Sequence, residues 1–206
     1  MGGKPASQLP NGATAPDGLT SATVDFQSLY KQEFGYAWRT LRRLGVREND
    51  LPDLAHDLFI VVFRNLSDYD SSRPVRPWLF GIAFRVVSAH RRKRRREIPF
   101  GIIELPDHHA DLDDGLQSRE ARHLVLAALE GIPLRRRAVL IMHELDDVPV
   151  AAVAAALKIP KFTVYSRLRK ARRELASALR RMLEGRDVGW RHVFEDHPRW
   201  ALACSP

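Results

Sequence analysis

The feature that most constrains the fold of this chain is a repeat of apolar residues at three- and four-residue steps, which begins directly after Asp25. This spacing places the side chains on one face of an α-helix, because 3.6 residues complete one turn. Asp25 is typical of a helix N-cap and Gly45 of a helix end. The sequence therefore predicts a first helix whose buried stripe consists of Phe26, Leu29, Tyr30, Phe34, Trp38, Leu41 and Leu44.

A second helix is predicted from Asp50 to about Leu66, with Pro52 in its first turn. Its second half contains LFIVVF, which is apolar nearly all round and, taken alone, also fits a short buried strand. The length of the whole segment and its flanking residues favour a helix. The surplus apolar surface is then either deeply buried or in contact with another protein.

A third helix is predicted to begin at Pro77, with Phe80, Phe84 and Arg85 on the face opposite its apolar stripe. It continues into six consecutive cations, Arg91 to Arg96. Their mutual repulsion predicts either a solvated helix end or contact with an external anion such as phosphate. The chain carries 33 Lys and Arg against 25 Asp and Glu, a net charge of +8, which favours nucleic acid as a partner, with anionic membrane as the alternative.

The rest of the chain predicts a second helical domain. Residues 98–116 are rich in acidic residues, Pro and Gly, which predicts a flexible linker. Helical periodicity then returns, and Pro133 is expected to open a helix that reaches Leu145. We expect an all-α chain of two small helical domains. The divisions are a disordered tail at 1–24, a first domain at 25–97, the linker, a second domain at 117–184 and a C-terminal extension at 185–206.

Within the second domain, a short helix from Pro149 to Leu157 and a longer helix are separated by a turn of about three residues, Lys158 to Pro160. This spacing is typical of a helix-turn-helix. The inner face of the longer helix is predicted to hold Val164, Leu168, Ala171 and Leu175, which leaves mostly cationic residues outward. A helix with such an outer face fits the major groove of DNA.

At this point the sequence resembles a known family. TVYSRLRKARREL is similar to the recognition helix of sigma factors of the extracytoplasmic-function group. DLAHDLFIVVFRNL and RPWLFGIAFRVVSAHRRKRRRE resemble the first conserved domain of the same family, and the two modules occur in the family's order over residues 25 to 182. The joint occurrence is far more specific than a helix-turn-helix alone. The resemblance implies a dissociable subunit of bacterial RNA polymerase that directs the enzyme to promoters.

The resemblance, together with the outward faces, gives three sets of functional residues. Recognition of the minus-thirty-five element is expected from Lys161, Thr163, Tyr165, Ser166, Arg167, Arg169, Lys170 and Arg172. Recognition and melting of the minus-ten element is expected from Ser71, Ser72, Arg73, Arg76, Trp78, Phe84, Arg85, Arg91 and Arg92. Docking to core polymerase is expected from Asp53, His56, Asp57, Leu58 and Phe59. The implied partners are core RNA polymerase, promoter DNA and an anti-sigma factor.

Four positions depart from the family's pattern. His56 and Asp57 stand where the family usually has Gln and Glu, and Arg85 stands where it usually has Asn. In the turn, Lys158 takes a place that the family often gives to Gly, so a left-handed backbone there would be strained. Because Arg85 replaces the usual Asn, the base preference at the minus-ten element is left open.

The sequence does not match the templates of enzymes or metal sites. His143-Glu144 begins like a zinc-protease motif, but Asp147 replaces the second histidine. Asp53 and Asp57 share a helix face, yet nothing supplies a nucleophile or a pocket around them. Cys204 is the only cysteine, which rules out an internal disulfide and a cysteine-rich zinc site. We expect no enzymatic activity, cofactor or metal.

The location and the rival function also follow from the sequence. The longest apolar run is too short to span a bilayer, and no secretory signal precedes the first helix, so a cytoplasmic protein is expected. The alternative function is a one-component helix-turn-helix regulator, which explains the second domain but not the first. The C-terminal extension contains Trp190, Phe194 and Trp200, and either docks on a domain or partner or merely extends the last helix.

Overall fold

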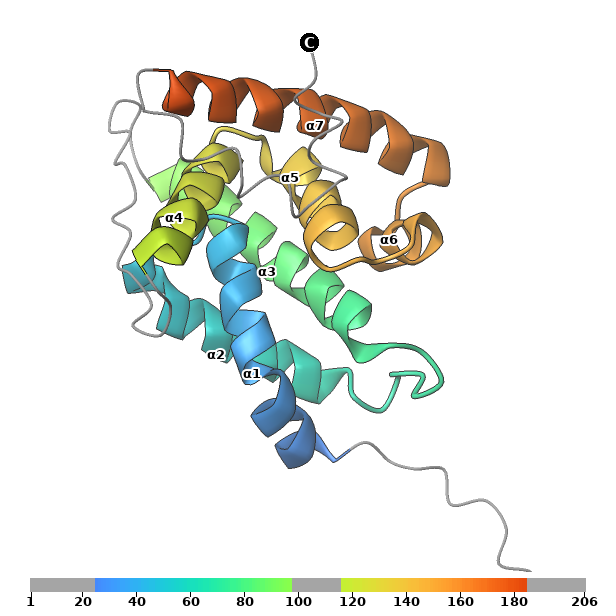
Figure 1. Ribbon diagram of the computed structural model, residues 1–206. Helices are drawn as coiled ribbons and strands as arrows, with labels where there is room; N and C mark the ends of the chain where they lie inside the picture. Colours follow the sequence, from blue (N-terminus) through green and yellow to red (C-terminus); the bar gives the residue numbers. More distant parts are fainter. Residues whose placement is uncertain (1–24, 98–115, 185–206) are drawn as a thin grey trace, which may run out of the picture.

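The computed structural model describes residues 25–97 and 116–184, and every regular element within them is helical (Figure 1). This confirms the predicted all-α class. The two tails and residues 98–115, which make up nearly all of the predicted linker, lie outside the described residues. In chain order the elements are α1 (Phe26–Arg43), the 3₁₀ turn η1 (Glu48–Asp50), α2 (Leu51–Arg64), α3 (Val75–Glu97), α4 (Leu116–Glu130), α5 (Leu134–Leu140), the π-helical turn η2 (Ile141–Leu145), α6 (Val150–Leu157) and α7 (Lys161–Leu183).

The first module consists of α1, α2 and α3, which contact one another pairwise. Asp25 caps α1 as predicted, since its carboxylate accepts hydrogen bonds from the backbone N–H groups of Gln27 at 3.3 Å and Ser28 at 2.9 Å. These hydrogen bonds, together with that of the Ser28 hydroxyl, lower the pKa of Asp25. After α1 the chain turns at Gly45, whose φ of 81° is a conformation that glycine adopts without strain.

The LFIVVF segment is helical, as its length predicted, and lies within α2. Leu58 and Val62 are fully buried, whereas Phe63 at the end of the segment is 65% exposed. Burial therefore accounts for Leu58 and Val62, whereas Phe63 is left accessible to a partner.

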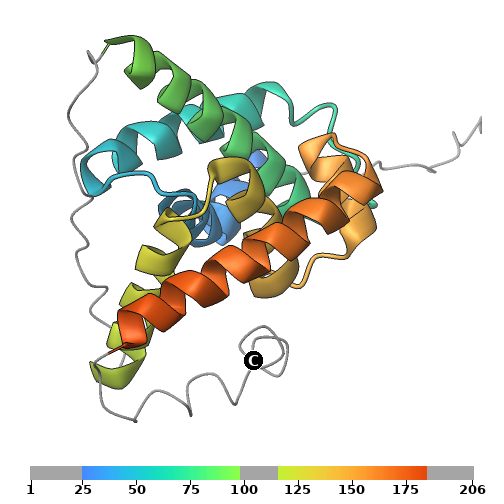
Figure 2. The ribbon, with the colours of Figure 1, turned by 90° about the horizontal axis from the view of Figure 1, so that it is seen from above.

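The second module consists of α4 to α7, with α7 lying across α4 and α5 (Figures 1 and 2). The predicted continuous helix from Pro133 to Leu145 is interrupted, because the α-helix ends at Leu140 and gives way to the π-helical turn η2. The wider turn brings His143 back to the chain that follows it, where Nδ1 lies 3.0 Å from the carbonyl oxygen of Val148.

The two modules pack against each other through α3 and α6, which lie side by side in both ribbon views (Figures 1 and 2). A Cβ at Gly81 would lie 2.6 Å from the carbonyl oxygen of Ala156, so only glycine permits this approach of α6 to α3. Phe80, expected on the face of α3 away from its apolar stripe, is completely buried. Both of these faces of α3 therefore carry core residues.

A polar contact adds to this junction. The hydroxyl of Tyr36 in α1 donates to Oδ2 of Asp146 at 2.8 Å, and Nη1 of Arg43 donates to Oδ1 at 3.0 Å. Burial raises the pKa of Asp146, although the hydrogen bond from Tyr36 and the charge of Arg43 favour the ionised carboxylate. Asp146, directly after η2, is thus the point at which the second module is held to α1.

Candidate nucleic-acid interface

The helix-turn-helix consists of α6, a turn at Lys158 and α7. Lys158 adopts φ 53° and ψ 49°, the left-handed conformation predicted to be strained for a residue other than glycine. The predicted inner face of α7 is confirmed, since each of its four residues is buried: Val164, Leu168, Ala171 and Leu175.

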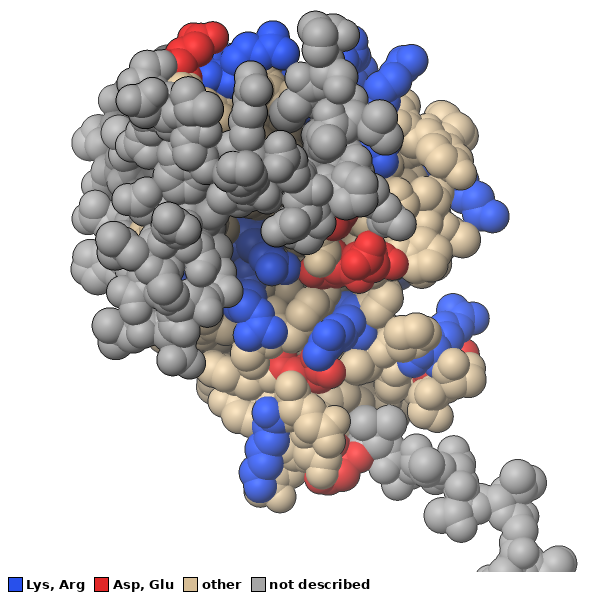
Figure 3. Space-filling model, viewed as in Figure 1, with Lys and Arg blue, Asp and Glu red and all other residues tan. Residues whose placement is uncertain are grey.

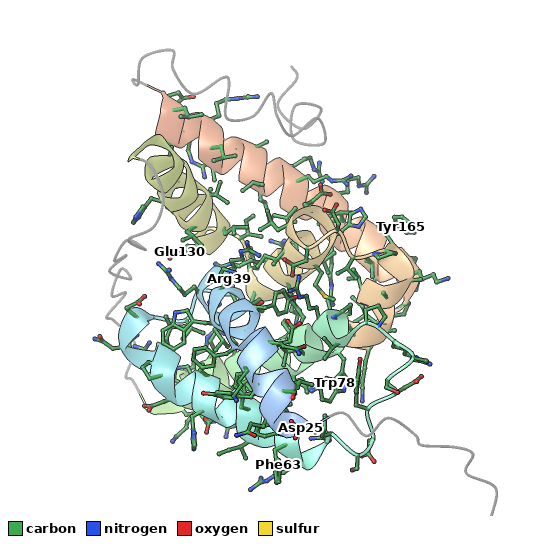
Figure 4. The ribbon with its side chains drawn as sticks, turned by 60° about the horizontal axis from the view of Figure 1, so that its bottom comes forward. Asp25, Arg39, Phe63, Trp78, Glu130 and Tyr165 are labelled. Carbon is green, nitrogen blue, oxygen red and sulfur yellow. The ribbon has the colours of Figure 1, made fainter. Side chains whose placement is uncertain are left out.

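The outer face of α7 is a stripe of exposed side chains at helical spacing, which we call the α7 face. Its first turn holds two aromatic side chains, Phe162 at 74% and Tyr165 at 61% exposure. Figure 4 places Tyr165 at the end of the molecule where α6 and α7 meet, and Figure 3 shows Lys and Arg side chains along the upper edge, over α7. The exposed residues that make up this face are Phe162, Tyr165, Ser166, Arg169 and Arg173, flanked by Lys161 and Lys170.

Three of the residues predicted to read the duplex are placed differently. Arg172 donates to Oε1 of Glu144 from Nε at 3.0 Å and from Nη2 at 2.5 Å, so its guanidinium holds α7 to η2. Arg167 is half-buried, and its pKa is lowered by burial and by the nearby charge of Arg135. Thr163 is half-buried, and its carbonyl accepts a hydrogen bond from the Ser166 hydroxyl at 3.1 Å.

The loop between α2 and α3 carries the first of the residues predicted to open DNA. Asp70 organises it, because Oδ1 accepts hydrogen bonds from the backbone N–H of Ser72 at 3.0 Å and from its hydroxyl at 2.6 Å. Arg73 forms an ion pair with Asp70 at 3.0 Å. Ser71, Ser72 and Arg73 are all exposed, so the loop presents hydroxyl and guanidinium groups to solvent.

An aromatic pair lies at the base of this loop. The rings of Tyr69 and Trp78 have centroids 4.7 Å apart, and both side chains are half-buried. Arg76 lies over the ring of Tyr36, 5.2 Å from its centroid, and pairs with Glu33 at 3.1 Å. On the next turns of α3, Phe84 is half-buried and Arg85 is exposed.

Arg91 does not lie on the surface expected to contact DNA. Its Nη2 donates to the carbonyl oxygens of Leu44 at 2.8 Å and Gly45 at 3.2 Å, and so closes the turn after α1. Burial, followed by the charge of Arg95, lowers the pKa of Arg91. Arg137 of the second module packs on the same turn, and its Nη1 leaves no room for a Cβ at Gly45. Arg91, which was predicted to contact DNA, is thus half-buried and bonded to this turn, whereas its neighbour Arg92 is exposed.

The predicted docking helix α2 divides into a buried and an exposed half. Leu58 and Phe59 have exposures of 0% and 5% and belong to the core, so a partner reaches only Asp53, His56 and Asp57 of the predicted set. The same helix face continues to Phe63, which lies beside the start of α1 in Figure 4 and contacts Phe26 edge-on at 5.1 Å. The sequence places Phe63 in the apolar LFIVVF segment, but Phe63 was not among the residues predicted to dock on core polymerase.

Other kinds of site are not formed by the described residues. Across 25–97 and 116–184, no three His, Cys, Asp or Glu side chains gather where they would hold a metal ion. We also find in these ranges no helix with the length and hydrophobicity that a membrane crossing requires. His143 and Glu144 instead have structural partners, the carbonyl of Val148 and the guanidinium of Arg172.

Comparison with known proteins gives the same division of the chain into two modules. The model of Sigma-70 region 2 matches residues 29–97, and that of Sigma-70 region 4 matches residues 122–175. The RNA polymerase sigma factor NccH of Alcaligenes xylosoxydans xylosoxydans is 31% identical over 144 residues, which are 67% of this chain and 77% of that protein. The ECF RNA polymerase sigma factor SigW of Bacillus subtilis is 21% identical over 184 residues, 79% of this chain and 91% of that protein.

Solved structures show the same fold. The sigma factor RpoE of Bartonella quintana, in complex with the anti-sigma factor NepR, superposes with a TM-score of 0.65 at 20% identity and covers 76% of this chain and 97% of that one. Two helical modules in this order, the second with a helix-turn-helix, define a transcription initiation factor rather than a catalytic enzyme. The chain belongs to the sigma-70 family of RNA polymerase sigma factors, in its extracytoplasmic-function group.

Proposed function

We propose that this sigma factor reads the minus-thirty-five element with α7, opens the minus-ten element with α3 and the loop before it, and docks on core polymerase through α2. The observation that carries the proposal is the α7 face. Four cations on it or beside it are exposed: Lys161, Arg169, Lys170 and Arg173. They form no ion pair with any residue that the structure describes. Cations left without protein anions along a recognition helix are suited to phosphates and base edges.

Duplex reading falls mainly to Arg169. It is exposed two turns into α7, where a guanidinium reaches the edge of guanine, and a bidentate contact of this kind contributes about 1 to 3 kcal/mol of discrimination. Lys161, Lys170 and Arg173 flank it and supply phosphate contacts, which fix the helix in the groove without reading sequence.

Strand opening falls to the loop and the first turns of α3. Unstacking a base costs a few kcal/mol, which stacking on an aromatic side chain and contacts to phosphates offset. Trp78, with Tyr69 against it, is the aromatic platform for such a base. Arg73, Arg76, Arg85 and Arg92 are exposed and supply the phosphate contacts, with the Ser71 hydroxyl as a further donor, since the hydroxyl of Ser72 already donates to Asp70.

Docking on polymerase falls to the exposed half of α2, which is acidic at Asp53 and Asp57 and aromatic at Phe63. A helical partner with cations opposite the carboxylates and apolar side chains opposite the ring complements this surface. Because core polymerase is cytoplasmic, this places the chain in the cytoplasm.

An anti-sigma factor is the second protein partner that we propose. RpoE of Bartonella quintana was solved with the anti-sigma factor NepR, and CnrH was solved with the cytosolic domain of CnrY. The second structure superposes with a TM-score of 0.51 at 22% identity. Both are sigma factors with the fold of this chain, which supports the same kind of control here.

The test is reconstitution of the full chain with bacterial core polymerase, followed by mapping of transcript starts across a genomic library. We expect a defined set of starts with a shared upstream element, and a changed set with Arg169→Ala but not with Ser177→Ala, an exposed position farther along α7. Failure to associate with the polymerase would contradict the proposal. Tight operator binding by the isolated chain would favour the one-component regulator, since a sigma factor alone is expected to bind DNA weakly and with strong salt dependence.

A further inference from the structure

Phe162 and Tyr165 begin the α7 face with an aromatic surface that the fold does not use. The two rings are 74% and 61% exposed and lie three residues apart, so they are neighbours on the first turn of the helix. Neither makes a ring contact with another described aromatic residue. Sequence reasoning assigned a role to Tyr165 only, although Phe162 precedes it at helical spacing.

The position of these rings indicates the kind of surface that covers them. The same face continues into Ser166, Arg169 and Arg173, and its cations are complementary to a polyanion. The N-terminal residues of a recognition helix are the ones that approach base edges in the major groove. The occupant that fits both halves of the face is therefore duplex DNA, with phosphates near the cations and a base edge against the rings.

Within the major groove, one base feature is complementary to phenylalanine. Phe162 has neither donor nor acceptor, so it does not read the hydrogen-bonding pattern of any base. The C5-methyl group of thymine is the apolar group that the bases present in this groove. Tyr165 adds a second ring and a hydroxyl beside it.

We propose that Phe162, supported by Tyr165, selects a thymine in the upstream promoter element by packing on its methyl group. The inference rests on the proposed function, because it requires α7 to enter the groove. Phe162 and Arg169 are seven residues apart, about 10 Å along the helix axis, which corresponds to at most about three base-pair steps. The selected thymine is therefore expected within about three base pairs of the base read by Arg169.

The experiment uses the full chain bound to core polymerase. The preferred upstream duplex is first selected from a random library, and each thymine in it is then replaced by uracil, which removes the methyl group and keeps every hydrogen-bonding group. We expect one replacement to weaken binding about fourfold, the effect of losing one buried methyl-sized group. Phe162→Ala should bind the thymine and uracil duplexes equally, and Phe162→Leu should keep part of the preference.

Two controls separate this role from others. Lys161→Ala, on the same turn, should weaken binding to both duplexes by the same factor and leave their ratio unchanged. Thermal unfolding of Phe162→Ala should match that of the unchanged chain, because the ring is exposed.

The inference is overturned if no thymine replacement weakens binding, or if Phe162→Ala keeps the preference for thymine. It is also overturned if Phe162→Ala weakens association with core polymerase while the ratio persists, since Phe162 would then contact protein. A library that yields no upstream element, or one whose selection is unaffected by Arg169→Ala, would instead contradict the proposed function, and the inference with it.

Discussion

Arg172 shows how one residue of a recognition helix takes a structural role. Glu144 is nearly enclosed, with 4% of its side chain exposed, whereas 43% of the Arg172 side chain is exposed. A buried carboxylate without a partner is unfavourable, and here two hydrogen bonds from one guanidinium satisfy it. The outer half of Arg172 faces solvent, but two of its nitrogens, Nε and Nη2, donate to Glu144 and hold the guanidinium in place.

We therefore expect Arg172→Gln to lower the free energy of unfolding by about 1 to 3 kcal/mol, the cost of leaving a buried acceptor without its charged donor. Urea denaturation of the full chain measures this change. Arg173→Gln, one residue further along and exposed, should stay within about 0.5 kcal/mol of the unchanged chain. The double variant with Glu144→Gln should lose less than the sum of the two single variants; additivity would show that the pair is not coupled.

Lys158 gives a second prediction at the residue scale. The left-handed conformation of Lys158 costs about 1 kcal/mol in the folded state, a cost that glycine does not have. Glycine also increases the conformational entropy of the unfolded chain, which offsets part of this gain. Lys158→Gly is expected to raise the free energy of unfolding by about 0.5 kcal/mol, whereas Lys158→Ala, which keeps the Cβ, should not. A fall in the denaturation midpoint with glycine would show that the lysine side chain stabilises the turn.

At the scale of the element, the proposed docking function of α2 depends on one exposed stripe, and Phe63 is the residue that tests this proposal. Phe63→Ala is expected to raise the Kd for core polymerase about tenfold, because an exposed aromatic side chain is a frequent centre of binding energy. Fluorescence anisotropy of the labelled chain, titrated with core polymerase in the absence of DNA, measures this Kd. Phe162→Ala removes an equally exposed ring from α7 and should leave this Kd unchanged. Equal effects of the two substitutions would contradict a docking role specific to α2.

Most of the helices were predictable from the sequence because the signals that form them are local. Asp25, Gly45 and the apolar stripe define α1 without reference to the rest of the chain. The π-helical turn was not predictable, because its register depends on the contacts of Glu144 and His143 with segments that follow it. A continuous periodic pattern does not reveal where one extra residue is inserted.

Site residues were predictable where helical periodicity alone determines whether a side chain is exposed. They were not predictable where exposure depends on how segments distant in the sequence pack together. Phe162 was within reach of the sequence, since it lies one turn before Tyr165 on the same face. Arg91 was not, because nothing in the cationic run shows which of its members hydrogen-bonds to the turn at Gly45. The same holds for Phe80, which is completely buried although the helical pattern of α3 places it away from the apolar stripe.

At the scale of the whole molecule, the packed arrangement of the modules conflicts with the geometry of a promoter. The minus-ten and minus-thirty-five elements are about 25 base pairs apart, which is about 85 Å of duplex. In the structure α6 of the second module touches α3 of the first. Simultaneous reading of both elements would therefore require the modules to separate. The 18 residues between them reach at most about 65 Å when extended, so the modules themselves would span the rest.

The contact at Asp146 is expected to oppose this separation. Asp146→Ala removes the acceptor for Tyr36 and Arg43 and should raise the population of separated modules about tenfold or more. Energy transfer between dyes at Arg64→Cys and Ser177→Cys, in a Cys204→Ser background, measures this population. Glu184→Ala, an exposed acid at the end of α7, should not change it. Unchanged transfer with Asp146→Ala would show that this contact does not hold the modules together.

Because Gly81 has no side chain, the packed form of the two modules is favoured, and this is expected to lower the apparent affinity of the protein for promoters. If only the form with separated modules binds promoters, the apparent affinity for every promoter is proportional to the fraction of molecules in that form. One methyl group at Gly81 would collide with the backbone at Ala156 and enlarge that share, while it favours the helical state of α3 by about 1 kcal/mol. We therefore expect Gly81→Ala to raise the apparent affinity for every promoter by a similar factor, and substitutions on the α7 face to change which promoters are bound.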